Sequence, residues 1–294
     1  MTLDVVAYLQ KKRAQIDEQL IMLLKRMEAP KRLKESMLYS VEAGGKRLRP
    51  ILMLAVVEAF QSKLEHAMQP AMALEFVHTY SLIHDDLPAM DNDDLRRGLP
   101  TNHKKFDEAT AILAGDGLLT FAFTCLSQAP FIDDKIKLWL IQGLANAAGP
   151  SGMIDGQMND IQAEGKTLDL IALEKIHQKK TGRLLEFAVM AGVMIANGDQ
   201  NTKDKLQLFA RHLGLAFQIQ DDILDIEGDE STMGKPVGSD IENKKNTYPE
   251  ILGLEGAKEQ LKVHFEQALD MLKRTSIQHE ILEGIARFIV ERHY

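Results

Sequence analysis

Two clusters of aspartates have the side-chain type and the spacing that could do chemistry in this sequence. They are Asp85, Asp86 and Asp91 in the first cluster, and Asp221, Asp222 and Asp225 in the second. Each cluster follows an apolar run with helical spacing, where the negative end of the helix macrodipole disfavours carboxylates. An unfavourable placement that occurs twice indicates a function. Mg²⁺ prefers oxygen ligands and is usually held by a few carboxylates together with substrate phosphates, so the clusters predict a metal site for a phosphorylated substrate.

Both clusters can present their carboxylates on one helix face. Gln218, Asp221, Asp222 and Asp225 stand at positions i, i+3, i+4 and i+7, and Leu74, His78, Leu82 and Asp85 share a face of another helix. In a helical bundle, two such faces can look at each other across a cavity. They could then hold two or three metal ions around a diphosphate.

Acidic clusters of this kind can also be purely structural, or they can bind iron. A solvated acidic helix end, or a run of helix N-caps, could account for a single Asp-Asp pair, but it accounts poorly for two clusters that each follow an apolar helix directly. A di-iron bundle usually presents Glu and Glu-x-x-His pairs, whereas these carboxylates are all Asp. The sequence also contains no phosphate loop of the GxxxxGK[ST] type, no GxSxG elbow and no HExxH zinc motif.

Basic residues lie close in sequence to the acidic clusters. The segment 44–50 reads GGKRLRP, Arg96 and Arg97 follow the first acidic loop, and Lys180 and Lys235 each stand beside a glycine or threonine. Glycines allow close approach of the backbone, and arginine forks onto phosphate oxygens. Each signal is weak alone and is also typical of surface ion pairs. Together with the carboxylates, they favour a substrate with two phosphorylated parts over simple metal storage.

Long helical patterns must position these residues. Apolar spacing predicts helices at 3–28, 50–61, 70–86, 107–128, 134–147, 169–196, 202–227, 255–273 and 278–291. Pro50 and Pro70 are read as first-turn residues, and 28–32, 87–104, 149–166 and 228–249 as loops. No stretch shows convincing strand alternation. The pattern predicts an all-α bundle with a deep central cavity, formed by one domain over residues 1–294.

Composition restricts the class of partner. The net charge of −8 argues against general nucleic-acid binding, which needs a basic face. The lone Cys125 cannot form an internal disulfide and fits a reducing cytoplasm. The N-terminus lacks a signal-peptide layout, and no apolar run is judged to reach the roughly 20 residues of a membrane span. We therefore expect a cytoplasmic protein that does not enter membranes.

The motifs, taken in order, resemble those of the trans-isoprenyl diphosphate synthases, and in particular the bacterial farnesyl diphosphate synthase branch. The segments that carry the resemblance are 44–50, 78–103, 113–120, 155–161, 177–182, 214–225 and 233–249. The resemblance implies an isoprenoid synthase-type bundle of about ten core helices, usually a homodimer, with three Mg²⁺ ions and with Mn²⁺ as the alternative metal. The implied reaction is head-to-tail condensation of isopentenyl diphosphate with an allylic diphosphate through an allylic carbocation.

The resemblance also implies roles for individual residues. The metal ligands would be Asp85 and Asp91 for two ions and Asp221 for a third, with Asp86, Asp222 and Asp225 in support. The allylic diphosphate would be held by Arg96, Lys180 and Lys235, and isopentenyl diphosphate by Lys46, Arg49, His78 and Arg97, with Gly45 allowing close approach. Thr181 and Gln218 would turn oxygen dipoles toward the cation, and Gln157 would lie near the reacting chain. The loop 228–249, with Lys235 and Lys245, would close over the site.

Product length would be set behind the first aspartate cluster. At about 1.5 Å per residue, Tyr80 lies roughly 7.5 Å of helix before Asp85. In the family, a bulky residue here blocks longer chains, and bacterial farnesyl-type enzymes pair it with two extra residues such as Pro88 and Ala89. Helical geometry places Ser81 more squarely beneath Asp85 than Tyr80. A C15 product is favoured and C20 is the alternative.

The sequence departs from the usual pattern of the family at two positions. Asp155 stands where a glycine is common, and Met233 stands where an aliphatic residue is usual. Arg292 is the only basic residue of the C-terminus expected to reach the site.

A terpene cyclase would carry an NSE-type second motif instead of DDxxD. A non-catalytic partner subunit of a heteromeric prenyl synthase usually lacks one or both aspartate motifs, and both are intact here.

Overall fold

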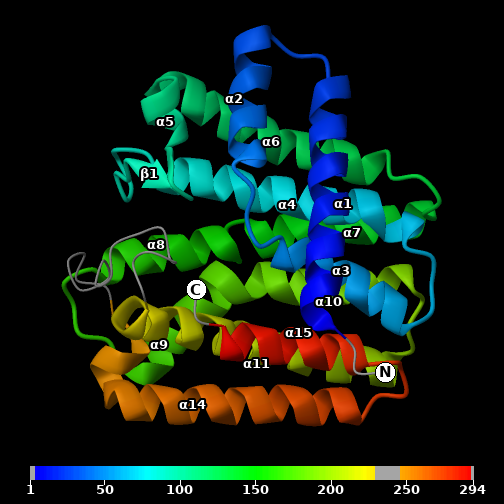
Figure 1. Ribbon diagram of the computed structural model, residues 1–294, viewed down its shortest axis with the longest axis vertical. Coiled ribbons are helices and arrows are strands. Elements are labelled where there is room, and N and C mark those ends of the chain that lie inside the picture. The colour runs from blue at the N-terminus through cyan, green and yellow to red at the C-terminus, as the bar shows by residue number, and fades with distance from the viewer. Residues whose placement is uncertain (1–3, 229–245, 293–294) are drawn as a thin grey trace.

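The computed structural model describes residues 4–228 and 246–292, and helices make up almost all of its regular structure (Figure 1). The first half of the chain forms α1 (Val5–Arg26), α2 (Lys31–Glu42), α3 (Leu48–Ala59), α4 (Glu65–Asp85), α5 (Asn102–Lys105), α6 (Glu108–Ser127) and α7 (Asp134–Ala148). The second half forms α8 (Met153–Ala163), α9 (Leu170–His177), the π-helical turn η1 (Gln178–Gly182), α10 (Arg183–Ile195), α11 (Gln200–Glu227), α14 (Tyr248–Lys273) and α15 (Glu280–Glu291). The prediction of an all-α fold is confirmed.

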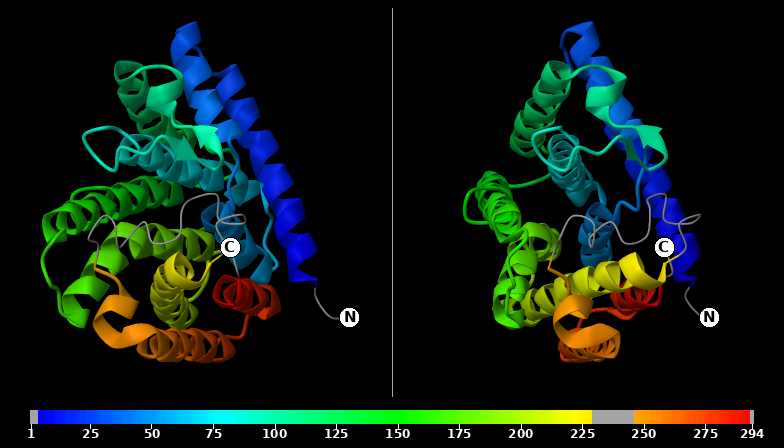
Figure 2. Two further views of the ribbon diagram at one scale, coloured as in Figure 1. Left: turned by 60° about the vertical axis from the view of Figure 1, so that its left-hand side comes forward. Right: turned by 90° about the vertical axis from the view of Figure 1, so that its left-hand side faces the viewer.

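Two directions of helix packing organise the molecule. In Figure 1, α1 and α2 stand nearly upright, whereas α4, α6, α8, α10, α14 and α15 run across them. Figure 2 shows α1 along one side of the molecule and α14 at the end opposite to α2. The main hydrophobic core extends in sequence from Leu9 to Ile289, and a smaller cluster lies between α11 and α14. Segments from both ends of the chain therefore contribute to the same core.

The helices α3 and α4 run through the interior because their sequences are apolar on most faces. Nearly every residue of α3 is buried, and α4 is buried over most of its length from Ala67 to Ile83. A helix that is apolar all round is stable only when neighbouring helices cover it. This position brings the C-terminal end of α4, with Asp85, to the interior side of the bundle.

Aspartate N-caps fix where the site-bearing helices begin. The Asp107 carboxylate accepts a hydrogen bond from the Thr110 backbone N–H at 2.7 Å at the start of α6. Asp199 does the same for Thr202 at 3.0 Å at the start of α11. Each cap satisfies a backbone donor that has no partner within the helix. The starting residue fixes the helix register, and so it decides which side chains of α11 line the neighbouring pocket, among them Gln218 and Asp221.

Two predicted boundaries around helices are wrong. The helix predicted from Pro70 begins at Glu65, so that Pro70 lies inside α4. The proline removes only one backbone hydrogen bond near the helix start, and the buried face from Ala67 onward outweighs that loss. Residues 149–166, read as a loop, contain α8. Gly156 lowers the helix propensity there, but a Cβ at Gly156 would lie 2.2 Å from the Lys180 backbone nitrogen, so close packing on η1 requires the glycine.

Several further elements were not predicted. No helix was expected over residues 31–42, where α2 buries only Ser36, Met37 and Val41. The helix predicted over 169–196 is interrupted by η1, and π-helical turns often occur at functional sites. Within the predicted loop 87–104, β1 (Leu95–Arg96) pairs with β2 (Leu99–Pro100) in an antiparallel hairpin. Its turn residues Arg97 and Gly98 both have positive φ angles, as a tight hairpin turn requires.

The helix α6 alone, among the described residues, is long and apolar enough to cross a membrane by length and composition. No run of this kind was expected from the sequence. Residues of α6 such as Ala114 and Leu118 are buried in the main core. Core helices of folded proteins pass the same test of length and hydropathy, so this finding is weak evidence for a membrane span.

Candidate active site

The first aspartate cluster lies where α4 ends. Asp85 is the last residue of the helix, and the chain then folds back so that the Asp91 backbone N–H donates to the Asp85 carbonyl oxygen at 2.9 Å. Burial raises the pKa of Asp85 to about 6, Lys180 acts in the opposite direction, and the charge of Asp91 adds to the rise. The loss of hydration on burial is therefore the main cause of the raised pKa of Asp85, and the charges around it have smaller effects.

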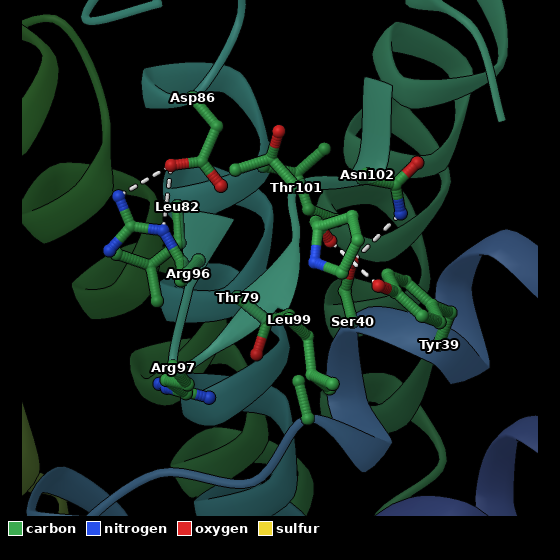
Figure 3. A pocket seen from close by; sticks show the side chains of 13 residues that line it. Tyr39, Ser40, Thr79, Leu82, Asp86, Arg96, Arg97, Leu99, Thr101 and Asn102 are labelled. Atoms are coloured by element: carbon green, nitrogen blue, oxygen red, sulfur yellow. Dashed lines mark hydrogen bonds and ion pairs between the residues drawn. The ribbon is translucent and has the colours of Figure 1, made fainter. Parts of the chain in front are cut away.

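Asp86 has a different partner from its neighbour. Its Oδ1 atom accepts from the Arg96 Nε at 2.7 Å and lies 2.5 Å from the Arg96 Nη2 (Figure 3). Burial raises the pKa of Asp86, and the contact with Arg96 opposes that rise. This pair attaches the β1–β2 hairpin to the end of α4. The predicted support of a metal site by Asp86 stays a prediction.

The second cluster lies in the last two turns of α11, near the helix end that the sequence predicts. The helix ends at Glu227, two residues after Asp225. The Asp222 carboxylate accepts from the Gln218 side-chain amide at 3.0 Å through Oδ1, and from the Tyr248 backbone N–H at 3.0 Å through Oδ2. Asp222 and Asp225 are buried. Asp222 therefore holds α11 against the start of α14, which agrees with a supporting position.

Asp221 is more exposed than Asp222 and faces the C-terminal end of the described chain. Its Oδ1 atom lies 2.6 Å from Nη2 of Arg292, whose side chain is almost fully buried. The same guanidinium donates to the Phe217 carbonyl oxygen at 3.1 Å and lies 4.2 Å from the centre of the Phe217 ring. The expectation that Arg292 reaches the site is confirmed in position.

Cationic side chains line a pocket of about 670 Å³ beside Asp221. The lining includes the predicted substrate residues Gly45, Lys46, Arg49, His78, Arg96, Arg97, Thr181 and Gln218. Burial, followed by repulsion from Arg292, lowers the pKa of Lys46 to about 8, and burial lowers the pKa of Arg97 to about 10. Buried cations with lowered pKa values lack full compensation by acids, so the pocket is suited to an anion.

Gly45 lies directly beneath one of these cations. A Cβ atom on Gly45 would lie 2.5 Å from Nη2 of Arg97, and the φ angle of Gly45 is +134°. The glycine thus permits close approach between the 44–50 segment and the hairpin that carries Arg97. The predicted close approach of the Gly45 backbone to a substrate stays a prediction, and the group that lies against Gly45 in this structure is the Arg97 side chain.

His78 and Arg49 also meet in this pocket. Nη1 of Arg49 lies 3.3 Å from Nε2 of His78. Burial lowers the pKa of His78 well below its ordinary value, and the neighbouring Arg49 and Arg97 add to that shift. The imidazole is therefore neutral, and its Nε2 can accept a hydrogen bond that orients the Arg49 guanidinium.

Lys180 and Thr181 lie in η1, between the two clusters. Lys180 Nζ lies 2.6 Å from the Asp160 carboxylate of α8. Burial is the largest single effect and lowers the Lys180 pKa, but Asp160, Asp85 and Asp91 together outweigh it, so the net shift is upward. The Thr181 hydroxyl donates to the Gln218 side-chain oxygen at 3.0 Å. Through Gln218, Thr181 is linked to Asp222.

An apolar cavity of about 390 Å³ lies behind Asp85. Its lining includes the predicted chain-length residues Tyr80 and Ser81, together with Gln157, Met158 and Ile161 of α8. Tyr80 is buried in the main core cluster. The cavity also reaches Lys180 and Thr181, so an apolar space and charged groups meet at the end of α4.

Several positioning residues were not predicted. Arg47, in a left-handed conformation with φ of 50°, lies 2.7 Å from Glu75 and 2.8 Å from Asp17, and both the Arg47 and the Glu75 side chains are buried. The position of Glu75 within an apolar helix could have indicated a basic partner such as Arg47, because a buried acidic side chain needs a partner. Asp160 gave no signal, because no spacing links it to Lys180. The predicted residues Lys235 and Lys245 lie outside the described residues, as does Met233.

Membership of a protein family follows from the match of the chain to a family model. The model described as polyprenyl synthetase matches residues 30–285. The chain belongs to the polyprenyl synthetase family. A farnesyl diphosphate synthase of Geobacillus stearothermophilus is 50% identical to the chain over 99% of each. The fold of this chain is therefore the all-α fold of prenyl synthases.

Solved structures of this family agree with the fold. An FPP/GFPP synthase from Zymomonas mobilis matches with a TM-score of 0.87 and 40% identity, over 99% of this chain and 100% of that one. A geranyltransferase from Helicobacter pylori, complexed with magnesium and isoprenyl diphosphate, matches with a TM-score of 0.82 and 34% identity, over 96% of each chain.

Proposed function

We propose that the chain is a farnesyl diphosphate synthase. This prenyltransferase condenses isopentenyl diphosphate with dimethylallyl diphosphate and then with geranyl diphosphate. The observation that carries the proposal is the meeting of three features at the end of α4: the carboxylates of Asp85 and Asp91, a cation-lined pocket, and an apolar cavity that contains Tyr80. The 50% identity to a farnesyl diphosphate synthase over nearly the full length supports it.

The carboxylates fit Mg²⁺ by the chemistry of their donor atoms. Among residues 4–228 and 246–292, no group of three or more His, Cys, Asp or Glu side chains is arranged to hold a metal ion by itself. Sites for Mg²⁺ typically draw their remaining ligands from water and substrate phosphates. We propose that Asp85 and Asp91 hold two ions and Asp221 a third, with Asp86, Asp222 and Asp225 in support. When bound, the ions neutralise charge that develops on the departing diphosphate.

The isopentenyl diphosphate site is assigned to the cationic pocket. Lys46, Arg49 and Arg97 supply positive charge there, and the neutral His78 orients Arg49 at 3.3 Å. Guanidinium groups bind phosphate oxygens through paired hydrogen bonds. Gly45 keeps the backbone of the 44–50 segment close enough for Arg97 to reach over it.

The allylic substrate is assigned to the other side of the same space. Arg96 and Lys180 face the first aspartate cluster. Together with Lys235, they would hold the diphosphate group of the allylic substrate. The linked oxygens of Thr181 and Gln218 would stabilise positive charge on the allylic carbon. The chain of the substrate would lie in the apolar cavity past Gln157, where water is excluded. The released diphosphate can take the proton, so the protein needs no general base.

Product length is assigned to the same cavity. The aromatic ring of Tyr80 lies in its lining behind Asp85, and Ser81 lines it as well. A large ring there leaves space for a short chain and favours the C15 product. C20 is the second candidate, because a geranylgeranyl diphosphate synthase of Cyanophora paradoxa is 42% identical to the chain over 90% of its length.

The proposed function is tested by product analysis. The purified chain is incubated with Mg²⁺, isopentenyl diphosphate and dimethylallyl diphosphate, and the dephosphorylated products are chromatographed. We expect a dominant C15 alcohol. Asp85→Asn removes a charge that acts in the transition state, so turnover should fall by at least about 100-fold. Glu35→Gln on the exposed face of α2 is the control and should keep full turnover.

Different products would favour the other functional classes. No prenyl product from folded protein with any allylic primer would contradict synthase activity and favour a partner subunit. A cyclic hydrocarbon would indicate a terpene cyclase. A C20 main product would keep the chemistry and overturn the length assignment.

A further inference from the structure

The ring of Tyr80 rests on a second ring within the apolar cavity. The Tyr80 and His84 rings meet edge to face, with 5.6 Å between their centroids and an interplanar angle of 81°. The two residues are four positions apart on α4, so their side chains lie one above the other on the same helix face. Both line the cavity behind Asp85. The direction of the Tyr80 ring therefore depends on where His84 is held.

The neighbouring helix α6 holds His84 in place. Nε2 of His84 lies 3.1 Å from the Ile112 carbonyl oxygen, which can only accept, so that nitrogen donates the hydrogen bond. Beside this contact, the imidazole occupies the space that a side chain at position 115 would need. A Cβ atom on Gly115 would lie 2.1 Å from Nε2 and 2.4 Å from Cδ2 of His84. Gly115 thus leaves a notch in α6 that receives the ring.

We propose that His84 and Gly115 determine product length through Tyr80. The His84 imidazole, seated in the Gly115 notch, keeps the Tyr80 ring across the cavity. Without His84 in that place, the Tyr80 ring can turn aside and the cavity can admit a longer chain. His84 is in this sense a positioning residue, because it acts through Tyr80. The inference rests on the proposed function, since it concerns the length of the prenyl product.

Two single variants address the support from opposite sides. His84→Ala removes the imidazole, and Gly115→Ala displaces it from the notch while His84 itself is unchanged. In both, with excess isopentenyl diphosphate, we expect a severalfold increase in the ratio of C20 to C15 product. Gly117→Ala is the matched control, because it makes the same change two residues along α6, where the new Cβ would meet the flexible end of Met37 at 3.2 Å. Its product ratio should equal that of the wild type.

A double variant tells whether His84 acts through Tyr80. Tyr80→Ala alone should lengthen the products, and His84→Ala should add nothing further in that background. Ratios that multiply in the double variant would overturn the inference, as would unchanged ratios in both single variants. If the wild type makes C15 and only the ratios fail to move, the inference alone is wrong. If the wild type makes no prenyl product, the proposed function is wrong.

His84→Ala lies beside Asp85, so a lowered rate is a separate effect from a changed ratio. The product ratio is therefore measured at equal substrate conversion. Thermal unfolding of each variant checks that it is folded. If His84→Ala does not fold, the comparison of Gly115→Ala with Gly117→Ala still tests the inference, because both substitutions lie on α6 and leave the sequence of α4 unchanged.

Discussion

Adjacent acidic residues in this chain differ in what holds them. Asp86 is paired with Arg96, and Asp222 accepts two hydrogen bonds from groups of α11 and α14, whereas Asp85 has the pKa of about 6 that burial produces. The spacing of the aspartates was enough to predict that both clusters matter. It could not tell which carboxylates are engaged by the protein, because those partners come from elements distant in the sequence.

The buried pair of Arg47 and Glu75 gives a prediction at this scale. Glu75→Gln leaves the buried Arg47 guanidinium with Asp17 as its one remaining acidic partner among the described residues. Breaking a buried ion pair on one side typically costs about 3 kcal/mol of unfolding free energy. We expect a loss of that size in urea denaturation at about neutral pH, and a higher KM for isopentenyl diphosphate, because Arg47 fixes the loop of Lys46 and Arg49.

The contrasting change is Glu35→Gln, which disrupts only the exposed pair with Lys31 on α2. Exposed pairs contribute little to stability, so its urea midpoint should stay close to that of the wild type. Equal midpoints for Glu75→Gln and Glu35→Gln would contradict the positioning role given to Arg47.

At the scale of elements, α2 and the β1–β2 hairpin form one unit around Asn102. The Asn102 side-chain oxygen accepts from the Ser36 hydroxyl at 2.8 Å, and its nitrogen donates to the Ser36 carbonyl at 3.0 Å and to the Ser40 hydroxyl at 2.8 Å. The Tyr39 hydroxyl donates to the Pro100 carbonyl oxygen at 2.6 Å. Figure 3 shows Tyr39, Ser40 and Asn102 close together on the right, away from Arg96 and Arg97 on the left.

Removing these contacts should loosen the hairpin in graded steps. Asn102→Ala leaves buried groups of Ser36 and Ser40 without partners, which should cost about 2 kcal/mol of unfolding free energy, whereas Tyr39→Phe loses one hydrogen bond and about 1 kcal/mol. We expect the KM values for both diphosphates to rise in the same order, with kcat less affected. Denaturation and steady-state kinetics measure both. A fall in kcat at unchanged KM would argue against the hairpin as the support of Arg96 and Arg97.

Sequence patterns predicted helices with regular apolar spacing better than interrupted ones. The helices α6, α7 and α11 begin and end within two residues of the predicted bounds, because their apolar spacing is regular. The pattern failed for α8 and η1, where Gly156 allows close packing between segments that are not neighbours in sequence. It also failed for α2, whose buried face is small. Tertiary packing outweighed local propensity in each of these places.

On the scale of the whole molecule, the bundle brings residues from both ends of the chain to one space. The pocket beside Asp221 is lined by Arg13 of α1, by the 44–50 segment, by α4 and by Arg292 after α15. The sequence predicted the all-α fold and the cavity, because both follow from apolar helices with polar faces. The contact of Arg292 with Asp221 could not be predicted, because it depends on the path of α15 through the fold.

Three predictions about the whole molecule stay predictions. These are a single domain over residues 1–294, a homodimer, and a cytoplasmic location. The exposed apolar residues Ile112 and Leu113 of α6 are available to a second copy of the chain, and sedimentation of the purified protein would measure its mass in solution.

The most direct test of the central claim compares the products of the wild type and of Tyr80→Ala. Both are incubated with Mg²⁺, dimethylallyl diphosphate and excess isopentenyl diphosphate, and chain lengths are read after dephosphorylation. A C15 product from the wild type that shifts to C20 and longer in the variant is the predicted result, because the ring occupies the cavity behind Asp85. A wild type that makes no C15 product, or a variant with an unchanged C15 distribution, would contradict the account.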